Sequence, residues 1–224
     1  MKKFYAFSKK SDDTTELLVY GDITSMRWDE SDVTGFDFAK ELMAVDTPKV
    51  VVRINSYGGE VSQGLGMYNL LKEFKGEVTT MCDGFACSSA SVVFMAGAKR
   101  VMPKTSLLMI HNPWTVAAGN ADEFRKMADD LEKITEPLIA SYVDNTGQSR
   151  DEVIRMMNEE TWLTADEALS LGFATEVTSE EPKASVESHI VFSLVEKLKN
   201  AQKVKPNNDT HEPVNPWEAY FGLK

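Results

Sequence analysis

Four short apolar runs occur in the first half of the chain, and each has the length and the β-branched content of a buried strand. They comprise residues 17–20, 49–54, 78–82 and 106–110. Glycine follows the first three runs within a few residues, which is typical of strands that end in tight turns. The pattern predicts at least four strands separated by turns.

Helical segments are predicted between these runs and after them. Apolar residues there recur mostly every three or four positions, which is the period of an amphipathic helix. The predicted helices cover residues 38–45, 61–71, 92–96, 120–144 and 152–157. Pro48 marks the end of the first helix, and Pro137 is a candidate kink in the longest one. Strands that alternate with helices in this way predict an α/β fold.

The composition of the chain changes near its end, which predicts a domain over residues 1–177 and an appendage over residues 178–224. The appendage begins as a polar linker, contains a short amphipathic segment at residues 189–199 and is then rich in Lys, Asn and Pro. It ends in an aromatic stretch at residues 216–221, which fits either a docking peptide or a frayed tail.

Composition and charge argue against several classes of partner. The formal net charge of −11 disfavours nucleic acid and anionic membrane surfaces as ligands. No apolar run approaches the ~20 residues of a membrane span, and the first residues lack the long apolar stretch of a secretory signal. We therefore expect a cytoplasmic protein. No other cysteine and no pair of histidines lies near Cys82 and Cys87, which argues against zinc. The two could in principle touch, but an intracellular location argues for free thiols.

Ser88 lies where a strand, a glycine turn and a helix are predicted to follow one another. Residues 84–88 (Gly-Phe-Ala-Cys-Ser) join the run at residues 78–82 to the next helix. Unpaired N–H groups and the positive end of the helix dipole can stabilise an anion at such a helix N-terminus. A nucleophilic serine needs that setting, because its attack on an acyl group creates an oxyanion. Serine is also a common N-cap without any chemistry, so this segment alone leaves both interpretations open.

Two further segments supply groups that such a nucleophile would need. Gly58 and Gly59 follow the strand at residues 49–54, and glycines let the backbone approach a ligand closely. His111 ends the run at residues 106–110 and is the only histidine in the apolar, patterned part of the chain. A histidine at a strand end suits a general base, although glycine pairs and single histidines usually have only structural roles.

Taken in order, these motifs resemble the ClpP family of serine peptidases. The residues that carry the resemblance are 55–59 (Asn-Ser-Tyr-Gly-Gly), 84–88 (Gly-Phe-Ala-Cys-Ser) and 109–113 (Met-Ile-His-Asn-Pro), with further likeness at residues 145–149 and 162–168. The likeness covers about residues 15–177. It implies an α/β fold of the ClpP/crotonase type, a spiral of βαβ units with a protruding strand-helix handle. That handle would include residues 112–119, which are expected to offer a sheet edge to an extended peptide.

Details of the sequence are most similar to one branch of this family. They are residues 20–23 (Tyr-Gly-Asp-Ile), 83–84 (Asp-Gly) and 111–114 (His-Asn-Pro-Trp). These details look more like the ClpP-related head-maturation proteases of tailed phages and prophages than like the housekeeping bacterial subunit.

The resemblance assigns a role to each candidate site residue. Ser88 matches the nucleophile, His111 matches the general base, and the backbone N–H groups of Gly59 and Ser89 match the oxyanion hole. The third member of the triad matches Glu160, where the family usually has Asp. The alternatives for the acid are Glu159 and Asp166, and Cys87 is an alternative nucleophile. Neither the residues nor the resemblance requires a metal or a cofactor.

Three hypotheses about function follow from the residues and the resemblance. The first is a serine endopeptidase that cleaves polypeptides inside a homo-oligomeric ring, or two stacked rings. Its substrate would be phage capsid or scaffold protein, or proteins delivered by an AAA+ unfoldase. The chain has no phosphate-binding loop of the Gly-x-x-x-x-Gly-Lys-Ser/Thr type, so any ATP would be used by a partner. The second hypothesis is a crotonase-type acyl-CoA enzyme, and the third is a non-catalytic shell protein.

Overall fold

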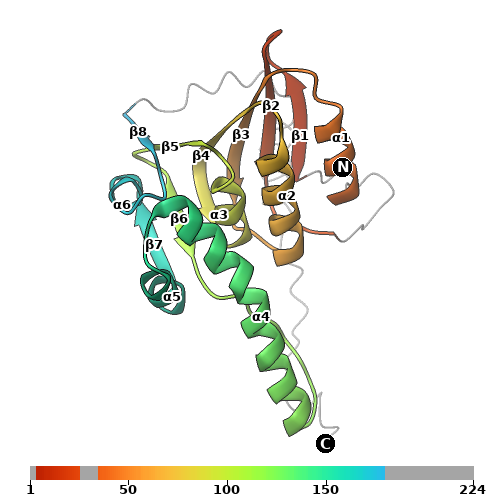
Figure 1. Ribbon diagram of the computed structural model, residues 1–224, viewed down its shortest axis with the longest axis vertical. Coiled ribbons are helices and arrows are strands. Elements are labelled where there is room, and N and C mark those ends of the chain that lie inside the picture. Colours follow the sequence, from red (N-terminus) through yellow and green to blue (C-terminus); the bar gives the residue numbers. More distant parts are fainter. Residues whose placement is uncertain (1–3, 26–34, 180–224) are drawn as a thin grey trace, which may run out of the picture. The chain divides into compact units, whose positions relative to one another are not determined.

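A mixed β-sheet, with helices packed on it, forms the part of the chain that the computed structural model describes, residues 4–25 and 35–179 (Figure 1). The strands are β1 (Tyr5–Lys9), β2 (Thr14–Tyr20), β3 (Lys49–Ser56), β4 (Glu77–Cys87), β5 (Lys99–Pro103), β6 (Leu107–Ile110), β7 (Thr161–Thr164) and β8 (Glu176–Thr178). The helices are α1 (Gly35–Met43), α2 (Val61–Glu73), α3 (Ser89–Phe94), α4 (Ala121–Thr146), α5 (Arg150–Asn158) and α6 (Ala165–Ser170). The predicted appendage, from residue 180 on, lies outside the described residues.

The centre of the sheet is parallel, and β4 lies at a fork in it. The main order is β1-β2-β3-β4-β5-β8, with only β1 antiparallel to its neighbour. The first half of β4 pairs with β5, whereas its last three residues pair in parallel with β6, which pairs antiparallel with β7. Because β4 and β6 run in parallel, their carboxyl ends meet at the same edge of the sheet.

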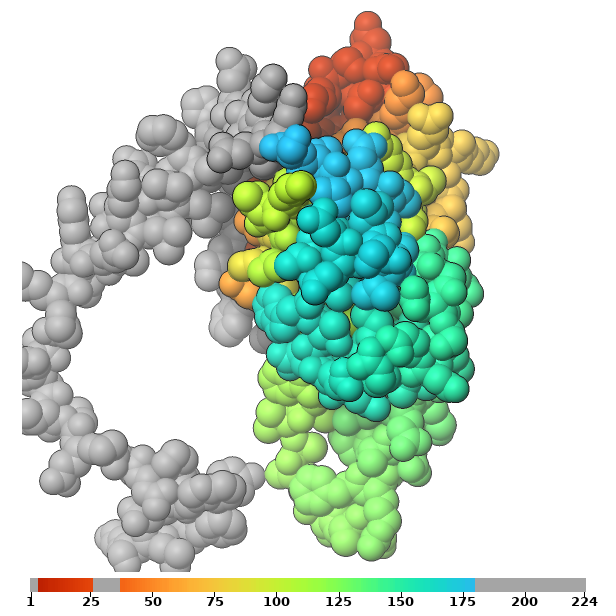
Figure 2. All heavy atoms as spheres, turned by 90° about the vertical axis from the view of Figure 1, so that its left-hand side faces the viewer, coloured from red at the N-terminus to blue at the C-terminus, as the bar shows by residue number. Residues whose placement is uncertain are grey.

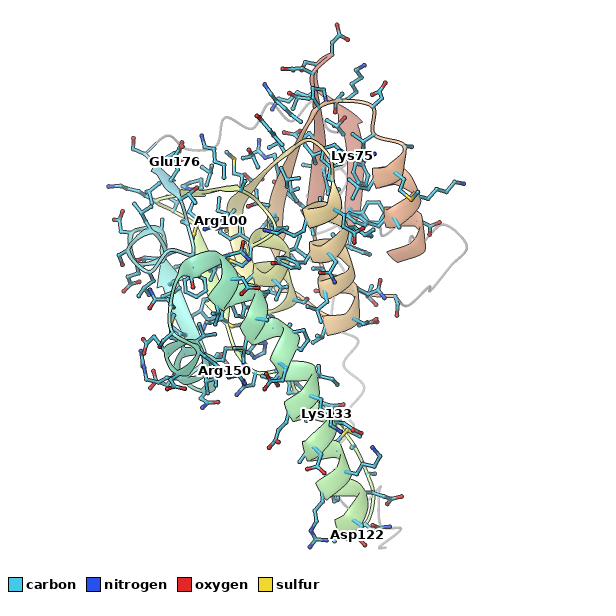
Figure 3. All side chains as sticks on the ribbon, in the orientation of Figure 1. Lys75, Arg100, Asp122, Lys133, Arg150 and Glu176 are labelled. Atoms are coloured by element: carbon cyan, nitrogen blue, oxygen red, sulfur yellow. The ribbon has the colours of Figure 1, made fainter. Side chains whose placement is uncertain are left out.

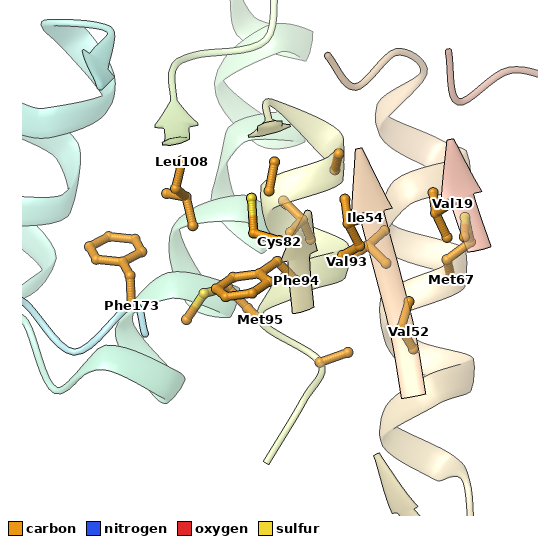
Figure 4. Close-up of a cluster of buried hydrophobic side chains, with 14 of the residues drawn as sticks. Val19, Val52, Ile54, Met67, Cys82, Val93, Phe94, Met95, Leu108 and Phe173 are labelled. Carbon is orange, nitrogen blue, oxygen red and sulfur yellow. The ribbon is translucent and has the colours of Figure 1, made fainter. Parts of the chain in front are cut away.

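One face of the sheet is buried under the helices, because every second residue of the central strands is apolar. Val52, Ile54 and Cys82 point from β3 and β4 into this core, where they meet Phe94 of α3. Figure 4 shows this cluster together with Phe173, which closes the core on the side of α5 and α6. The side chains on the other face of β2–β4 stay partly exposed.

Charged groups pair on that partly exposed face. The Asp83 carboxylate accepts two hydrogen bonds from the Arg53 guanidinium, at 2.7 and 2.8 Å, and one from the Tyr20 hydroxyl at 2.6 Å. The hydrogen bonds to Asp83 raise the pKa of Arg53. This pairing satisfies three polar side chains that the sheet would otherwise leave half-buried without partners.

The predicted strand, glycine turn and helix around Ser88 differ in part from the structure. Instead of turning at Gly84, β4 continues to Cys87, and its register against β3 shifts so that Ile54 pairs with Cys82 but Ser56 pairs with Ala86. A Cβ atom on Gly84 would lie 2.7 Å from the side-chain oxygen of Asn55. Glycine thus lets the Asn55 side chain approach the strand here, and the turn comes four residues later, at Ser88.

The long helix α4 is partly outside the core. Its apolar stripe is buried only near the C-terminal end, at residues such as Leu138 and Tyr142. Phe124, Met127 and Ile134, nearer its N-terminus, are exposed. In Figures 1 and 2 this N-terminal part extends away from the sheet. The periodicity thus predicted the helix correctly, but only its last turns pack in the core.

Arg100 ties the C-terminal end of α4 to the rest of the core (Figure 3). Its buried guanidinium donates to the carbonyls of Gly97, Asn145, Gly172 and Phe173, at 2.7 to 3.0 Å. One of these carbonyls, that of Asn145, lies in the last turn of α4, where the helix dipole is negative. None of the helices in the described ranges has the length and apolar character needed to cross a bilayer.

Candidate active site

Ser88 lies at the point where β4 ends and α3 begins, and its backbone adopts a conformation that is rare for non-glycine residues. Its φ is 56° and its ψ is −128°. The Ser88 N–H donates to the carbonyl of Met109 at 2.9 Å, so the ladder between β4 and β6 reaches the serine itself. Its carbonyl accepts from the N–H of Ser91, also at 2.9 Å. Backbone hydrogen bonds therefore hold this turn on both sides, which is how a strained conformation persists in a folded chain.

His111 follows β6 directly and meets Ser88 at the shared edge of the sheet. Its Nε2 atom lies 2.8 Å from the Ser88 Oγ atom. If the serine hydroxyl donates this hydrogen bond, the neutral ring carries its proton on Nδ1 and Nε2 is free to accept the serine proton. Both side chains are half-buried. The structure thus brings together the predicted nucleophile and the predicted general base, in the geometry that proton transfer requires.

The loop at Gly58 and Gly59 packs directly against Ser88. A Cβ atom on Gly58 would lie 2.6 Å from the Cys87 carbonyl and 2.7 Å from the Ser88 Cβ atom, so only glycine fits there. Gly59 pairs with Ile23 in a parallel bridge, with a φ of 143°. Among the described residues, neither Gly59 nor Ser89 donates its N–H to a backbone carbonyl. The N–H groups of these two residues, one from each of two segments that meet at Ser88, therefore have no backbone acceptor in the described chain.

Side chains hold this glycine loop in place. The Ser56 hydroxyl donates to the Gly21 carbonyl at 2.5 Å and accepts from the Gly58 N–H at 3.0 Å. Beyond the loop, the Glu60 carboxylate accepts hydrogen bonds from the N–H and the hydroxyl of Ser25. Burial by itself would raise the pKa of Glu60, but these hydrogen bonds outweigh it and lower the pKa. The loop is thus anchored at both ends.

Glu160 lies opposite His111 in the continued register of β6 and β7, but the two side chains form no hydrogen bond with each other. The last pair of the β6–β7 ladder is Ile110 with Thr161, and His111 and Glu160 are the next residue on each strand. The carboxylate of Glu160 is exposed and has no hydrogen bond to any of the residues described. Its φ is 50°, and in the described ranges only Ser88 shares a positive φ among non-glycine residues. Two rare backbone conformations thus flank His111, and such conformations cluster at functional sites.

The two alternative acids lie in other surroundings. Glu159 forms an ion pair with Arg155 of α5. Asp166 lies in the first turn of α6, where it is exposed. The segment after β6 is joined to the last residue of α5 by a hydrogen bond of 2.7 Å from the Asn112 side chain to that of Asn158. Glu160 stays the candidate acid, because the β6–β7 register continues from Ile110–Thr161 to His111 and Glu160, whereas Glu159 is paired with Arg155.

The cysteine alternative for the nucleophile does not fit its surroundings. Cys87 and Cys82 are both fully buried. Burial raises the pKa of the Cys87 thiol to about 11 and that of Cys82 to about 12. A thiol attacks as its thiolate, so a buried and protonated Cys87 is a poor nucleophile at neutral pH. Within the described ranges, no three His, Cys, Asp or Glu residues come together as a candidate metal site.

The segment at residues 112–119 belongs to no helix and to no strand of the described chain. Its role as a sheet edge for a peptide therefore stays a prediction. Trp114 is 74% exposed, so it does not fill a gap in this core.

Several residues at this site were missed by motif-based reasoning. Ser56 and Asn55 belong to a motif that was recognised, but their contacts join segments about 30 residues apart: Asn55 accepts a hydrogen bond from the Phe85 N–H at 3.2 Å. Ser91 and Tyr142 lie 51 residues apart and share a buried hydrogen bond. For this second pair the sequence carries no signal, because each residue fits an ordinary helical pattern.

Comparison with known proteins identifies relatives of the chain. Residues 31–181 match the family described as Clp protease. The chain is 37% identical over 139 residues to an ATP-dependent Clp protease proteolytic subunit of Bacteroides fragilis, a match that covers 61% of this chain and 67% of the relative. A protein of the same name from Bacteroides thetaiotaomicron is 35% identical over 139 residues, with 61% and 63% covered. The chain therefore spans about two thirds of the length of these relatives.

A solved structure supports the fold. The chain is similar to a point mutant of ClpP1 from Listeria monocytogenes, with a TM-score of 0.62 and 25% sequence identity. The match covers 74% of this chain and 91% of that structure. The fold predicted from the resemblance is thereby confirmed: it is the α/β fold of ClpP.

Proposed function

Because the chain belongs to the Clp protease family, whose members are serine-type peptidases, we propose that it hydrolyses internal peptide bonds with Ser88 as nucleophile. The observation that carries the proposal is the distance of 2.8 Å between the Ser88 Oγ and His111 Nε2 atoms. The two residues follow parallel strands of one sheet, so the fold itself sets this distance.

The reaction is an acyl transfer in two stages. His111 accepts the Ser88 proton while Oγ attacks the peptide carbonyl carbon, and the carbonyl oxygen becomes an oxyanion. The N–H groups of Gly59 and Ser89 donate to that oxyanion. His111 then gives its proton to the leaving amine, which departs and leaves an acyl group on Ser88. Water, activated by His111, repeats the attack and releases the second product.

Glu160 is the third member of this triad in our proposal. A carboxylate on the Nδ1 side of the ring would hold the tautomer that leaves Nε2 free, and would stabilise the imidazolium that forms. Support comes from the strand pairing, which places Glu160 one residue beyond the last β6–β7 pair, next to His111. Glutamate is one methylene longer than the usual aspartate, and a longer side chain can span the distance from an exposed turn.

The natural substrate is proposed to be a capsid or scaffold protein of a tailed phage or prophage, cleaved inside an oligomeric ring. The support is the sequence at residues 20–23, 83–84 and 111–114, which is similar to head-maturation proteases. The alternative is a cytoplasmic proteolytic subunit that receives unfolded chains from an ATP-dependent partner. It is favoured by the printed names of the relatives, which are ATP-dependent Clp protease proteolytic subunits.

Cleavage of an unfolded polypeptide tests the proposed activity. The full-length protein and its Ser88→Ala variant are incubated with a quenched fluorescent casein, and light scattering gives the particle mass of both. We expect cleavage by wild type alone, from particles of ring size in both samples. Equal cleavage by the variant would contradict the role of Ser88, and a monomer that cleaves would contradict the ring.

A second assay separates the two substrate classes. A folded protein that carries a degradation tag is added with a Clp unfoldase and ATP, and in parallel a purified phage capsid precursor is added alone. Specific, limited cleavage of the precursor, with no stimulation by unfoldase and ATP, is the expected result. Processive degradation that depends on ATP would favour the alternative instead.

A further inference from the structure

A buried pair of hydroxyl groups connects α4 to the backbone of Ser88. The Tyr142 Oη and Ser91 Oγ atoms are 2.7 Å apart, and Ser91 Oγ donates to the Ser88 carbonyl at 2.6 Å. Tyr142 is 1% exposed and Ser91 is fully buried. The catalytic steps above use neither hydroxyl. Three groups thus form a continuous chain from the long helix to the candidate nucleophile.

The number of available protons fixes which group donates in each of these hydrogen bonds. A carbonyl oxygen only accepts, so the single proton of the Ser91 hydroxyl is committed to Ser88. The Tyr142 hydroxyl must then donate to Ser91. Burial raises the pKa of Tyr142, so the phenol keeps the proton that it donates. Each bond polarises the next one, and in a buried site this strengthens the hold on the Ser88 carbonyl.

The Ser88 carbonyl and the Ser89 N–H belong to the same peptide group. The described chain contains no cis peptide bonds, and in a planar trans peptide the C=O and N–H bonds point in opposite directions. A hydrogen bond that fixes the direction of the carbonyl therefore also fixes the direction of the Ser89 N–H. That N–H is one of the two donors proposed for the oxyanion.

This peptide group needs such support because of its conformation. The ψ angle of Ser88 sets the orientation of the peptide that follows it, and the combination of a ψ of −128° with a φ of 56° is one that serine rarely adopts. Tyr142 is itself held firmly, since its ring packs against Phe173 with 5.8 Å between centroids. Its own carbonyl accepts from the Thr146 hydroxyl at 2.8 Å. A phenol fixed in the core can therefore hold the Ser88 turn in one orientation through Ser91.

We propose that Tyr142 and Ser91 are positioning residues, which aim the Ser89 N–H at the oxyanion. The inference rests on the proposed peptidase function and adds a requirement to it: the oxyanion donor depends on a hydroxyl from α4. Loss of that hydroxyl leaves the Ser88–His111 pair in place, together with the backbone hydrogen bonds from Ser91 and Val92 to the Ser88 carbonyl, but weakens the side-chain bond that fixes the exact angle of the Ser88–Ser89 peptide.

Three variants and one control test this role. Tyr142→Phe removes the hydroxyl and keeps the ring, Ser91→Ala breaks the chain in the middle, and the third variant combines both changes. The control is Tyr20→Phe, which also removes a partly buried hydroxyl with a 2.6 Å hydrogen bond, to Asp83 on the other face of the sheet. Thermal melting of each variant checks that it is folded.

The readouts isolate the oxyanion from stability and from substrate binding. Steady-state cleavage of a peptide gives kcat and KM. The affinities of a peptide aldehyde and of the matching peptide alcohol are also measured. Ser88 Oγ adds to the aldehyde carbon, and the carbonyl oxygen moves to the position of the oxyanion, whereas the alcohol binds without forming any bond. The ratio of the two affinities therefore reports the oxyanion donors alone.

Tyr142→Phe should lower kcat on the order of tenfold, less than the ~100-fold or more typical of a deleted donor, because the N–H is misaimed but still present. KM should stay unchanged, and the preference for aldehyde over alcohol should fall by the same factor as kcat. The double variant should be no slower than Ser91→Ala alone, since both changes break one chain. The control should match wild type in all of these measurements.

Two different failures can be told apart. If wild type cleaves and Tyr142→Phe keeps the wild-type kcat and aldehyde preference, the positioning role is wrong and the peptidase function stands. Additive losses in the double variant, or a loss of melting temperature with no change in the aldehyde preference, would also overturn it. If wild type itself neither cleaves nor binds the aldehyde better than the alcohol, the proposed function fails and the positioning role falls with it.

Discussion

The two sides of the His111 ring are built differently. On the Nε2 side, Ser88 is held by backbone hydrogen bonds to Met109 and Ser91, and Gly58 packs against it with no room for a side chain. The partner proposed for the Nδ1 side, Glu160, lies on an exposed turn, and its carboxylate makes no hydrogen bond within the described chain. The proposed nucleophile is therefore positioned by the strands themselves, whereas the proposed acid would be positioned only by a flexible side chain.

This difference indicates which parts of the site tolerate change. The serine after β4 cannot move without breaking its backbone hydrogen bond to Met109, which continues the pairing of β4 with β6. An exposed glutamate reaches its partner by rotation about its own side-chain bonds, at a modest cost in side-chain entropy. A family that usually has aspartate can accept glutamate at such a position, because the fold does not fix the length of the side chain there.

The largest effect is expected from the residue that both sides share. His111→Ala removes the base that accepts the serine proton, and should lower kcat by on the order of 10⁴-fold or more. Peptide hydrolysis under steady-state conditions measures it. His189→Ala is the matched control, because it removes a histidine far along the chain, and it should leave kcat unchanged. Activity that survives in His111→Ala would contradict the role of His111 as the base.

The acid side is tested by amide variants of neighbouring carboxylates. Glu160→Gln should lower kcat by about 10²- to 10⁴-fold, because an amide neither holds the correct tautomer nor stabilises the imidazolium. Glu159→Gln is the matched control and should change kcat less than about twofold, since Glu159 only pairs with an exposed arginine. Equal losses in the two variants would move the acid elsewhere.

The nucleophile side is tested by adding one methyl group. Gly58→Ala brings a Cβ atom to 2.6 Å from the Cys87 carbonyl, so the loop must move away from Ser88. We expect kcat to fall by about 100-fold, comparable to the loss of an oxyanion donor. Gly147→Ala is the matched control: this glycine also has a positive φ, but nothing lies within 4 Å of the added atom.

Thermal melting separates strain from the clash in these two variants. Both should lose about 1 kcal/mol for forcing alanine into a positive φ, and Gly58→Ala should lose more. A Gly58→Ala variant with the kcat of Gly147→Ala would show that the loop does not contribute to the site.

The smallest effect is expected from thiol chemistry. Because burial raises the pKa of Cys87 to about 11, its thiolate fraction is very small at pH 7 to 9 and grows only as the pH approaches 11. Iodoacetamide at pH 8 should therefore leave the activity intact and Cys87 unalkylated by mass spectrometry. Rapid inactivation, with alkylation at Cys87, would favour the cysteine as nucleophile.

The sequence predicted what is local and periodic in this molecule. The strand at residues 49–54, the glycine pair after it and the helix that follows were all predicted from spacing and turn chemistry, and β3 and α2 confirm them. The order of the motifs around Ser88 and His111 predicted the fold. Each strand, turn, helix and motif is defined by a short run of neighbouring residues, so a single sequence was enough to find them.

Contacts between distant segments were beyond reach of the sequence. The extension of β4 to Cys87 depends on Asn55 packing against Gly84, and the hold on Ser88 depends on Tyr142, 51 residues from Ser91. The apolar stripe of α4 predicted a face but not what covers it: Leu138 is buried, whereas Phe124 on the same stripe is half exposed. Periodicity gives the direction of a side chain, and only the assembled fold gives its neighbour.

Labelling with a fluorophosphonate tests the central claim most directly, since the probe phosphonylates a serine that is activated by a base. Wild type and the Ser88→Ala variant are incubated with the probe, digested and mapped by mass spectrometry. We predict a single adduct, on the peptide that contains Ser88, and none in the variant. An adduct on another residue, or equal labelling of both proteins, would contradict the assignment of Ser88 as the nucleophile.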